Sequence, residues 1–540
     1  MTGLLNPGGV FLSRGHYLRA GRGAQCGRVE SLETAARFTL AVRFFYDPYQ
    51  PCLKKGKGCH EDMKPNTKAP PLGLRAASLI VSLSASLLTP ALFSRVVSGE
   101  DQLANQPKSE YAKRRQALMQ KLKDGVVVLV GAREEDLGEV ARFRQKNNFM
   151  YLTGVETPAA YLMLVPAGLI PGRPASETVF IPPRNPGRER WNGVQLGPGK
   201  EAENIFGVQE VAGSDGFKDR LNELLNSAAF KGEGGAQRAK LYTIIPAGKT
   251  AEIERETHFV ARIRQETPHV ALVDVSRIIA EMRKVKSAAE IALLQKAVDI
   301  TNEGQREAAR TIRPGAFEYE AQAAIEAAFT RNGSERPGYP SIVGSGVYST
   351  ILHYNSSRKK IQAGDLVVVD VGAEYSYYTA DITRTFPASG KFTPRQREIY
   401  QLVLEAQRAA EKAFKPGVST LASLHSAAVE AIRASPLRDK QGNTLDRYFI
   451  HGLSHWLGMD VHDVGGYATL PAGAVFTIEP GIYIPEERLG VRIEDDYLVT
   501  DTGLVKLSRA LPSEPDGIEG MMTNSQPSVS APRSAAGGLR

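Results

Sequence analysis

Between about residue 108 and residue 280, short apolar runs alternate with amphipathic segments. Four runs rich in β-branched or aromatic residues end at or near Gly or Pro, as buried strands do; they are 125–132 (GVVVLVGA), 149–155 (FMYLTGV), 159–168 (AAYLMLVPAG) and 177–183 (ETVFIPP). Segments 109–123 and 216–230 instead place apolar residues at i, i+3 and i+4, which is typical of helices. This alternation predicts an α/β domain over residues 108–280.

The later part of the chain contains clear helix start signals. Ser287 precedes an apolar-periodic segment and Glu290 follows three residues later, which predicts a capping box at the start of a helix. A second helix is predicted after Thr393, with Pro394 at its first position and Gly417 beyond its end. Both signals indicate long helices in a further folded region.

The segment 76–94 is uncharged and lies between Arg75 and Arg95. A helix that spans a bilayer needs about 20 mainly apolar residues, whereas this run is short, rich in serine and interrupted by Pro90. Together with the basic residues that follow Met63, it has the pattern of a secretory signal. We therefore predict that translation starts at Met63 and that the protein is exported, to the periplasm or the medium, with no stable membrane insertion.

Both ends of the chain are predicted to lack a fold. Residues 1–62 are rich in Gly and Arg without periodicity, and we interpret them as an upstream extension ahead of a signal-like segment at 63–99. Residues 513–540 are rich in Pro, Ser, Gly and Ala and are predicted to be a disordered tail. Alternatives for the N-terminal region are a single membrane anchor, a transit peptide formed by the first 40 residues, and a cytoplasmic protein.

The composition indicates a globular protein of two or three domains, with 540 residues, 42% of them hydrophobic and 23% charged. The net charge of +8 resides in residues 1–99, which hold 13 Lys and Arg against 5 Asp and Glu, because the rest of the chain holds 54 of each sign. A neutral body argues against a nucleic-acid partner. All three cysteines precede residue 60, so a metal site in the folded body would use nitrogen and oxygen ligands.

Acidic residues occur at strand positions in the later part of the chain. Asp370 follows a run of valines, and Asp381 lies in a second β-type run after a polar and aromatic bend, so residues 365–387 predict a hairpin with neighbouring carboxylates. Glu479 stands at the end of a further apolar run, and Glu494 lies in another predicted strand, after Arg492. Buried like charges repel each other, and so they need a cation or a shared proton.

Three of the nine histidines, His451, His455 and His462, fall within the stretch HGLSHWLGMDVHDVG. Taken alone, a strand aspartate is often a turn or cap residue, and a histidine often satisfies a core hydrogen bond. Taken together, four acids and these imidazoles form a hard, oxygen-rich donor set that suits Mn²⁺, Zn²⁺, Co²⁺ or Fe²⁺. The joint set therefore favours a metal site.

Several segments resemble consecutive signature blocks of one enzyme family. VDVGAEYSYYTADITRTFPASGKFT, HGLSHWLGMDVHDVG, TIEPGIYI and VRIEDD occur in order and resemble the pita-bread metallopeptidases, the family of methionine aminopeptidase, prolidase and aminopeptidase P. Ahead of them, RQKNNFMYLTGVETPAAYLMLVP and RERWNGVQLGPG resemble the N-terminal domain that aminopeptidase P and prolidase carry. The resemblance implies an α/β (α+β) chain, with an N-terminal α/β creatinase-type domain at 108–280 and a C-terminal pita-bread metallopeptidase domain at 285–512.

The resemblance also implies a role for each candidate residue. Two divalent metal ions would be held by Asp370, Asp381, His455, Glu479 and Glu494, with Asp381 and Glu494 bridging the ions. His353, His451 and His462 would line the substrate site, Arg492 would order the carboxylates, and Glu479 would also shuttle a proton. We expect Mn²⁺, with Zn²⁺ and Co²⁺ as alternatives, and we expect neighbouring acids to favour protonated His451 and His462.

The implied activity is that of an Xaa-Pro aminopeptidase, a metal-dependent exopeptidase that releases the first residue of peptides with proline in second position. The two ions would lower the pKa of a bridging water, and the resulting hydroxide would attack the scissile carbonyl. Ser454, His455 and Trp456 resemble aminopeptidase P more than prolidase, so Xaa-Pro dipeptidase is the second prediction and a metal-free peptide-binding member of the fold is a remote third. By analogy with the family we expect a homo-oligomer, a dimer or tetramer.

Overall fold

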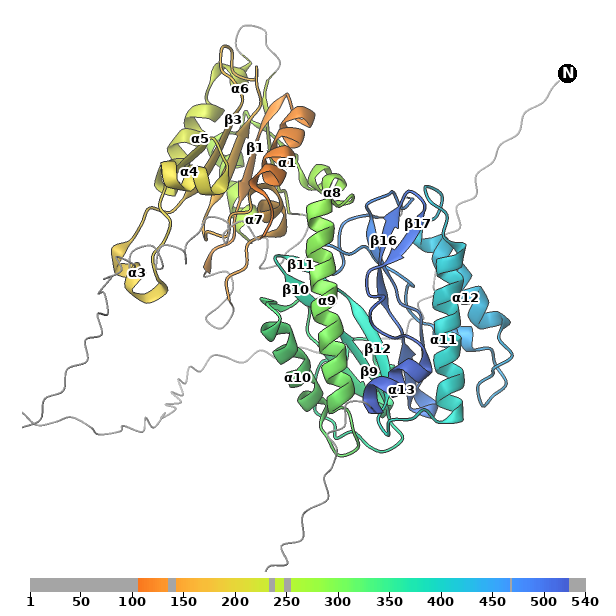
Figure 1. Cartoon of the computed structure of the whole chain (residues 1–540). Coiled ribbons are helices and arrows are strands. Elements are labelled where there is room, and N and C mark those ends of the chain that lie inside the picture. The colour runs from red at the N-terminus through yellow and green to blue at the C-terminus, as the bar shows by residue number, and fades with distance from the viewer. Residues whose placement is uncertain (1–104, 135–141, 233–237, 247–253, 467–468, 524–540) are drawn as a thin grey trace, which may run out of the picture. The chain divides into compact units, whose positions relative to one another are not determined.

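The computed structural model of the chain describes residues 105–134, 142–232, 238–246, 254–466 and 469–523 (Figure 1). The predicted upstream extension at 1–62, the signal-like segment at 63–99 and residues 524–540 of the predicted tail lie outside this part of the chain. Within the described residues, no helix combines the length and the apolar character that crossing a lipid bilayer requires.

The N-terminal part, residues 108–283, is built on one mixed β-sheet with flanking helices (Figure 1). Its elements are α1 (Lys108–Lys121), β1 (Gly125–Val130), α2 (Asn147–Thr153), β2 (Tyr161–Val165), β3 (Ser176–Ile181), α3 (Pro186–Asn192), α4 (Lys200–Phe206), β4 (Glu210–Gly213), η4 (Ser214–Gly216), α5 (Phe217–Leu225), α6 (Ala228–Lys231), β5 (Lys240–Thr243), α7 (Glu254–Glu266), β6 (Ala271–Asp274) and α8 (Ser276–Arg283). The strand order is β4-β3-β2-β1-β5-β6, in which β2 is antiparallel to both neighbours and the other pairs are parallel.

The central strand β1 explains why its sequence is apolar without alternation. Val126 and Val128 pack in one hydrophobic cluster with residues of α5 and α7, whereas Val127 and Leu129 pack in another with residues of α1, α2 and α4. Because helices cover both faces of the sheet, neither face of this strand has room for a polar residue. The predicted strands in 125–132, 159–168 and 177–183 are confirmed as β1, β2 and β3.

One predicted strand is a helix. The run 149–155 belongs to α2, which ends before Gly154, a residue with a φ of 67°. Residues 149–153 are all buried, so no polar face marks the helical period, and a short apolar run of this kind fits a strand or a buried helix equally well. The predicted helix at 216–230 is interrupted at Asn226 and forms α5 and α6.

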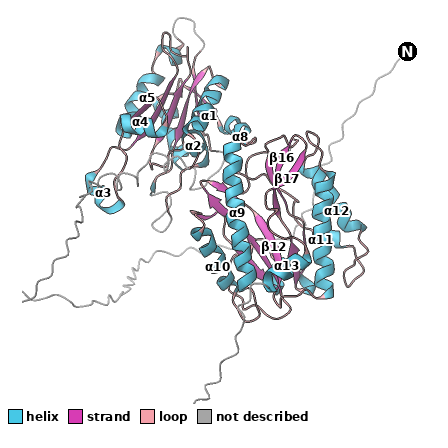
Figure 2. Cartoon of the chain, in the orientation of Figure 1, coloured by secondary structure: helices cyan, strands magenta, loops and turns pink. Residues whose placement is uncertain are grey.

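The C-terminal part, residues 287–523, combines long helices with several small sheets (Figure 2). Its helices are α9 (Ala288–Thr311), α10 (Glu318–Arg331), α11 (Pro394–Ala413), α12 (Leu421–Ala434) and α13 (Pro515–Thr523), with the short 3-10 turns η7 (Gly346–Thr350), η8 (Leu445–Tyr448) and η9 (Pro485–Glu487). Its strands are β7 (Arg336–Pro337), β8 (Ile342–Ser345), β9 (Leu366–Val371), β10 (Ala373–Tyr375), β11 (Tyr378–Thr379), β12 (Ile382–Pro387), β13 (Val475–Ile478), β14 (Gly481–Ile484), β15 (Leu489–Arg492), β16 (Asp495–Thr500) and β17 (Gly503–Lys506).

These strands pair in the orders β11-β10-β7, β12-β9-β8, β13-β16-β17 and β14-β15. Helix α9 packs against α10, and α11 packs against α12. Figure 1 shows the two helix pairs on opposite sides of the strands of this part. One hydrophobic core joins residues of all four helices to the buried faces of β9, β13, β14 and β15, so the helix pairs hold the small sheets together.

Both predicted helix starts are confirmed. Ser287 Oγ accepts a hydrogen bond from the Glu290 N–H at 3.3 Å, and Glu290 Oε2 accepts one from the Ser287 N–H at 2.9 Å. Thr393 and Gln396 form the same box at α11, with Pro394 at the first helical position. The boxes satisfy N–H groups that have no partner inside the helix.

The predicted disordered tail begins too early along the chain. Residues 515–523 form α13, in which Ile518 and Met522 lie one turn apart and are buried in the core. Two apolar residues on one helical face provide the burial that stabilises this short helix. The average composition of 513–540 hides them, because most of its Ser, Pro and Gly lies after Thr523.

Candidate metal centre

Two acids lie together beside the ladder between β9 and β12. Asp370 is paired with Thr383, and Asp381 stands just before β12, so the two acids are diagonal neighbours. The Tyr339 hydroxyl lies 2.7 Å from Asp370 Oδ1 and 2.5 Å from Asp381 Oδ1. The link between the strands is more elaborate than the predicted hairpin, because β10 and β11 form a smaller hairpin within it.

Glu479 and Glu494 come from the ends of other strands. Glu479 directly follows β13, and its N–H donates to the Leu453 carbonyl at 2.9 Å. Glu494 lies between β15 and β16, and its Oε2 accepts a hydrogen bond from the Thr383 hydroxyl at 2.7 Å. Its Oε1 is buried and has no hydrogen-bond partner among the described residues. A buried carboxylate oxygen of this kind needs a further partner.

His455 is the imidazole at the centre of this group. Its Nε2 lies 3.3 Å from Asp381 Oδ2, 3.5 Å from Glu479 Oε1 and 3.9 Å from Glu494 Oε1. Its Nδ1 lies 3.1 Å from the carbonyl oxygen of Trp456, which only accepts hydrogen bonds. In its neutral form the ring therefore carries its proton on Nδ1 and leaves the Nε2 lone pair free to bind a cation.

The pKa values of Asp381, His455, Glu479 and Glu494 are all raised, because these residues lie close together with little positive charge among them. Burial, reinforced by Asp381, raises the pKa of Glu479 to about 8. Burial and neighbouring carboxylates also raise the pKa of Asp381, and they raise that of Glu494 well above its usual range. Burial alone would lower the pKa of His455, but its contacts with Asp381 and Glu479 outweigh burial and raise the pKa to about 9.

Divalent cations fit this donor set. One ligand atom from each of Asp381, His455 and Glu494 lies within 4.8 Å of the other two. Carboxylates with one imidazole and no thiolate suit Mn²⁺, Co²⁺ or Zn²⁺. A cation would offset the repulsion between the acids and give Glu494 Oε1 its missing partner. With Asp370 and Glu479 adjoining, the donors suffice for two ions, although the assignment of each ligand stays a prediction.

Arg492 supplies buried positive charge at one side of the acids. Its Nη2 lies 2.5 Å from Asp370 Oδ2, and its Nη1 donates to the Tyr483 hydroxyl at 2.9 Å. His451 Nε2 lies 2.9 Å from the same hydroxyl. These contacts fix the Asp370 carboxylate, as the predicted ordering role of Arg492 requires.

The remaining histidines are close to the group, and the acids do not keep His451 and His462 protonated. His353, His451 and His462 line a cavity of about 560 Å³ together with all five predicted ligands. Burial and then the charge of Arg492 lower the pKa of His451 to about 4. Burial and then the charge of His455 lower the pKa of His462. The prediction that acids favour the protonated rings is therefore wrong, because burial and nearby cations outweigh the acids.

The cavity has an acidic floor and a partly apolar wall. Pro340, Ile342, Leu352 and Val461 contribute the apolar surface. The rings of His455 and His462 meet edge to face, with centroids 4.4 Å apart. A ligand can therefore contact charged groups and apolar groups at the same time.

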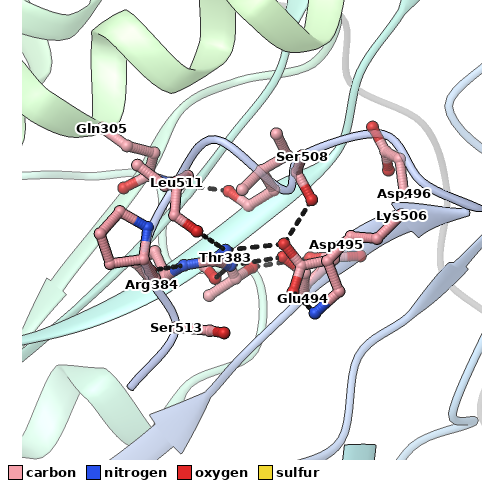
Figure 3. Close-up of polar contacts among 12 residues, drawn as sticks. Gln305, Thr383, Arg384, Glu494, Asp495, Asp496, Lys506, Ser508, Leu511 and Ser513 are labelled. Carbon is pink, nitrogen blue, oxygen red and sulfur yellow. Dashed lines mark hydrogen bonds and ion pairs between the residues drawn. The ribbon is translucent and has the colours of Figure 1, made fainter. Parts of the chain in front are cut away.

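Arg384, Asp495 and Lys506 form a second group of charged residues next to Glu494 (Figure 3). Asp495 Oδ1 accepts from Arg384 Nη2 at 2.7 Å, and Lys506 Nζ lies 3.1 Å from Asp495 Oδ2. Arg384 also donates to the backbone carbonyls of Thr383 and Glu494, at 2.9 and 2.8 Å. Burial alone would raise the pKa of Asp495, but Arg384 and Lys506 outweigh burial and lower it.

Sequence reasoning missed several residues whose side chains contact the predicted ligands or Arg492, among them Tyr339, Thr383 and Tyr483. Thr383 follows Asp381 by two residues, so the period of a strand was a usable signal for it, whereas Tyr483 lies on β14, a different strand from the one that Glu479 follows. Tyr339 had no such signal. It precedes β8, far from Asp370 and Asp381 in the sequence, and only folding brings its hydroxyl to them.

An α/β chain that gathers four acids and an imidazole in one cavity has the features of a metal-dependent hydrolase. Residues 292–501 match metallopeptidase family M24, and residues 111–231 match the aminopeptidase P N-terminal domain. The chain belongs to the aminopeptidase P family of M24 metallopeptidases and is a metallo-exopeptidase. The predicted family and the predicted succession of an N-terminal α/β domain and a pita-bread domain are confirmed.

Individual relatives differ in how much of the chain they match. The Xaa-Pro aminopeptidase of Escherichia coli is 35% identical over an alignment of 445 residues, and the match covers 77% of this chain and 98% of that protein. The structure of zinc-substituted E. coli aminopeptidase P in complex with product aligns with a TM-score of 0.69 and 31% identity, over 78% of this chain and 99% of that one. The Xaa-Pro dipeptidase of Pyrococcus furiosus is 37% identical, but over 277 residues, 50% of this chain and 76% of that protein.

Proposed function

We propose that this metallo-exopeptidase is an Xaa-Pro aminopeptidase, which releases the first residue from peptides with proline in second position. The observation that carries the proposal is the group of four acids and one imidazole in a single cavity, where one Glu494 oxygen has no hydrogen-bond partner from the residues that the structure describes. The E. coli Xaa-Pro aminopeptidase matches across both domains, whereas the dipeptidase matches half of the chain. These matches favour the aminopeptidase over the dipeptidase.

Asp370, Asp381, His455, Glu479 and Glu494 would hold two divalent metal ions. Such ions, when bound, make a water molecule acidic near neutral pH and polarise a carbonyl group. We propose Mn²⁺, with Zn²⁺ and Co²⁺ as alternatives, because oxygen donors outnumber the single imidazole. Asp381 adjoins both Asp370, through the Tyr339 hydroxyl, and His455, which supports its proposed bridging position.

Glu479 is the residue that moves a proton. Its Oε1 faces His455, and its Oε2 lies 3.7 Å from His451 Nδ1. Oε2 accepts a proton from the attacking water and passes it to the leaving nitrogen of the peptide.

His353 and His462 donate hydrogen bonds to the scissile carbonyl oxygen as its negative charge grows. The lowered pKa of His462 keeps its ring neutral, and a neutral imidazole still has one N–H to donate. A neutral donor also adds no positive charge beside the cations that the acids hold. Both histidines line the cavity with the acids, which supports this role.

The acidic and apolar surfaces of the cavity explain why it would select a peptide with a free amino group and proline in second position. The free α-amino group of a peptide is positively charged and is attracted by the acidic floor, which confines cleavage to the first residue. The apolar wall suits the proline ring. Proline has no backbone N–H, so the wall need not supply an acceptor for one.

A cleavage comparison with defined peptides tests the proposal. The purified chain is treated with a chelator, reloaded with Mn²⁺, Zn²⁺ or Co²⁺, and offered Ala-Pro-Ala, Ala-Ala-Ala and Ala-Pro. We expect metal-dependent release of alanine from Ala-Pro-Ala, with kcat/KM about a hundredfold above that for Ala-Ala-Ala. Cleavage of Ala-Pro alone would identify a dipeptidase, and no metal-dependent release would favour the metal-free peptide-binding alternative.

Assembly and location are two further proposals. By analogy with the family, the chain forms a homo-oligomer, and a monomer in light scattering would contradict this. The protein is exported from a start at Met63, because residues 63–99 have the charge and hydropathy pattern of a secretory signal. N-terminal sequencing of the native protein tests export, and a mature start ahead of Met63 would contradict it.

A further inference from the structure

Residues 351–360 bring Leu352, His353 and Asn355 to the cavity, and we call them the wall segment. They follow η7 and precede β9, and they form neither helix nor strand apart from a single bridge at Lys360. Of these ten residues only Ser357 is buried. Apolar packing therefore contributes little to the placement of His353, and polar contacts decide it.

Two of those polar contacts end on one carboxylate oxygen. The Tyr354 hydroxyl and the Lys359 N–H both donate to Glu318 Oε2, each at 2.8 Å. The Tyr354 ring also stacks on Tyr348 of η7, with centroids 4.6 Å apart and an interplanar angle of 13°. The residue directly after His353 is thus held both through its ring and through its hydroxyl.

The other oxygen of Glu318 holds the strand beside the acids. Oε1 accepts hydrogen bonds from the Ser345 N–H at 2.8 Å and from the Ser345 hydroxyl at 2.7 Å. Ser345 ends β8, in which Ile342 is paired with Asp370 of β9. Glu318 is fully buried in the first turn of α10, where a helix N-terminus favours an anion. One carboxylate therefore links the wall segment to the strand next to a predicted metal ligand.

Ser357 indicates that the wall segment does not simply follow its own conformational preference. Its φ is 48°, in the left-handed region that residues other than glycine rarely adopt. Its buried hydroxyl has no hydrogen-bond partner within the described chain. Both features are unfavourable by themselves, so contacts elsewhere in the segment must maintain them.

We infer that Glu318 is a positioning residue, which holds His353 in the cavity wall through Tyr354 and the Lys359 N–H. Glu318 does not line the cavity, so it acts through the wall segment and touches no substrate. The inference rests on the proposed function, in which His353 stabilises the developing oxyanion. Burial and then the hydrogen bond to Glu318 raise the pKa of Tyr354 to about 12, so its hydroxyl remains a donor at neutral pH.

Three variants of the full chain test this inference. Tyr354→Phe removes one hydrogen bond and keeps the ring that stacks on Tyr348. Glu318→Gln replaces one acceptor oxygen with an NH₂ group that faces other donors. Tyr242→Phe is the matched control, because the Tyr242 hydroxyl donates to Asp124 at the same 2.8 Å within the N-terminal part. For each variant we measure kcat and KM with Ala-Pro-Ala, metal affinity and thermal unfolding.

We expect kcat/KM to fall about fivefold in Tyr354→Phe and about 30-fold in Glu318→Gln, as the loss of one and of two or more hydrogen bonds implies. Metal affinity stays unchanged in both, and kcat/KM stays unchanged in Tyr242→Phe. The decisive measurement repeats Tyr354→Phe in a His353→Ala background. If Tyr354 acts by placing His353, its effect shrinks there to less than about twofold.

Two results would overturn the inference. One is an equal loss of kcat/KM with and without His353, and the other is full activity in a folded, metal-loaded Tyr354→Phe protein. If Glu318→Gln does not fold, Tyr354→Phe alone decides, because it removes a single hydroxyl. An inactive unmodified enzyme would instead contradict the proposed function, so the two failures are distinguishable.

Discussion

Glu494 and Asp495 are neighbours in the sequence and are both buried, yet their surroundings are opposite. Glu494 faces other carboxylates, and one of its oxygens has no hydrogen-bond partner in the described part of the chain. Burial and Asp381 raise its pKa well above the usual range. Asp495 faces Arg384 and Lys506 (Figure 3), which outweigh burial and lower its pKa. Burial is common to both acids, so the charges around each acid decide the sign of its shift.

The difference separates two uses of a buried acid. On the side of Asp495 the ion pair and hydrogen bonds are complete, and breaking such a buried set is strongly destabilising. On the side of Glu494 the acids repel each other, and added cations are needed to relieve the repulsion. We therefore expect matched neutral substitutions at the two positions to change the stability of chelator-treated protein in opposite directions.

Glu494→Gln should have the largest effect on turnover. It removes a predicted bridging ligand, so cleavage of Ala-Pro-Ala should fall by about a thousandfold or more. The chelator-treated variant should be more stable than the unmodified chain, because a buried like charge has been removed. Steady-state kinetics and urea unfolding measure the two effects. Full activity would contradict the two-ion assignment, and Asp495→Asn is the matched control.

Asp495→Asn should destabilise the protein by about 3–5 kcal/mol, because it leaves the buried Arg384 guanidinium without its counter-charge. Since Arg384 also holds the Glu494 backbone carbonyl, metal affinity should fall by about 10- to 100-fold. Urea unfolding and metal competition measure these changes. Unchanged stability would mean that the Arg384–Asp495 ion pair contributes nothing to the stability of the fold. It would then contradict the contrast drawn between Asp495 and Glu494.

His462→Ala should have an intermediate effect. The residue lines the cavity but is not a predicted ligand, so kcat should fall about a hundredfold while the metal content is retained. Kinetics and elemental analysis of the same preparation give both quantities. Loss of metal from this variant would assign His462 to the metal centre and change the predicted ligand set.

The smallest expected effect is a pH dependence of the chelator-treated protein, whose stability should fall as the pH rises from 6.5 to 8. Glu479, with its pKa raised to about 8, loses in this window a proton that the unfolded chain has already lost. His455, with a pKa of about 9, contributes stability that is complete below pH 6.5 and is lost as the pH rises. His451, with its pKa lowered to about 4, contributes an opposite slope that is half gone at pH 6.5 and fades as the pH rises further.

Urea unfolding at several pH values across this window measures the slope. Glu479→Gln should make the slope shallower, because one of the two titrating groups is gone. Metal affinity should change in the opposite direction and rise with pH, since the ligands bind metal in their deprotonated forms. Stability that rises between pH 6.5 and 8 would contradict the pKa shifts of the acid group.

Local patterns predicted much of the fold. The capping boxes at Ser287 and Thr393 and the strands β1, β2 and β3 depend on residues close together in the sequence, so their signals survive without tertiary context. The prediction of a strand at 149–155 was wrong because a fully buried helix shows no polar face. The predicted ligands came from family resemblance, since four isolated acids and a histidine are individually common.

The sequence by itself therefore determined the starts of two long helices, several buried strands, the family, and the residue types of a hard metal site. Only the tertiary structure decided that the Tyr339 hydroxyl contacts Asp370 and Asp381 and that the pKa of His451 is lowered. It also decided that the pKa of Glu494 is raised while that of Asp495 is lowered. Capping and periodicity act over one or two turns, whereas the pKa of a buried group depends on every charge that folding brings near it. Those charges belong to distant strands and helices, and their distances exist only once the chain has folded.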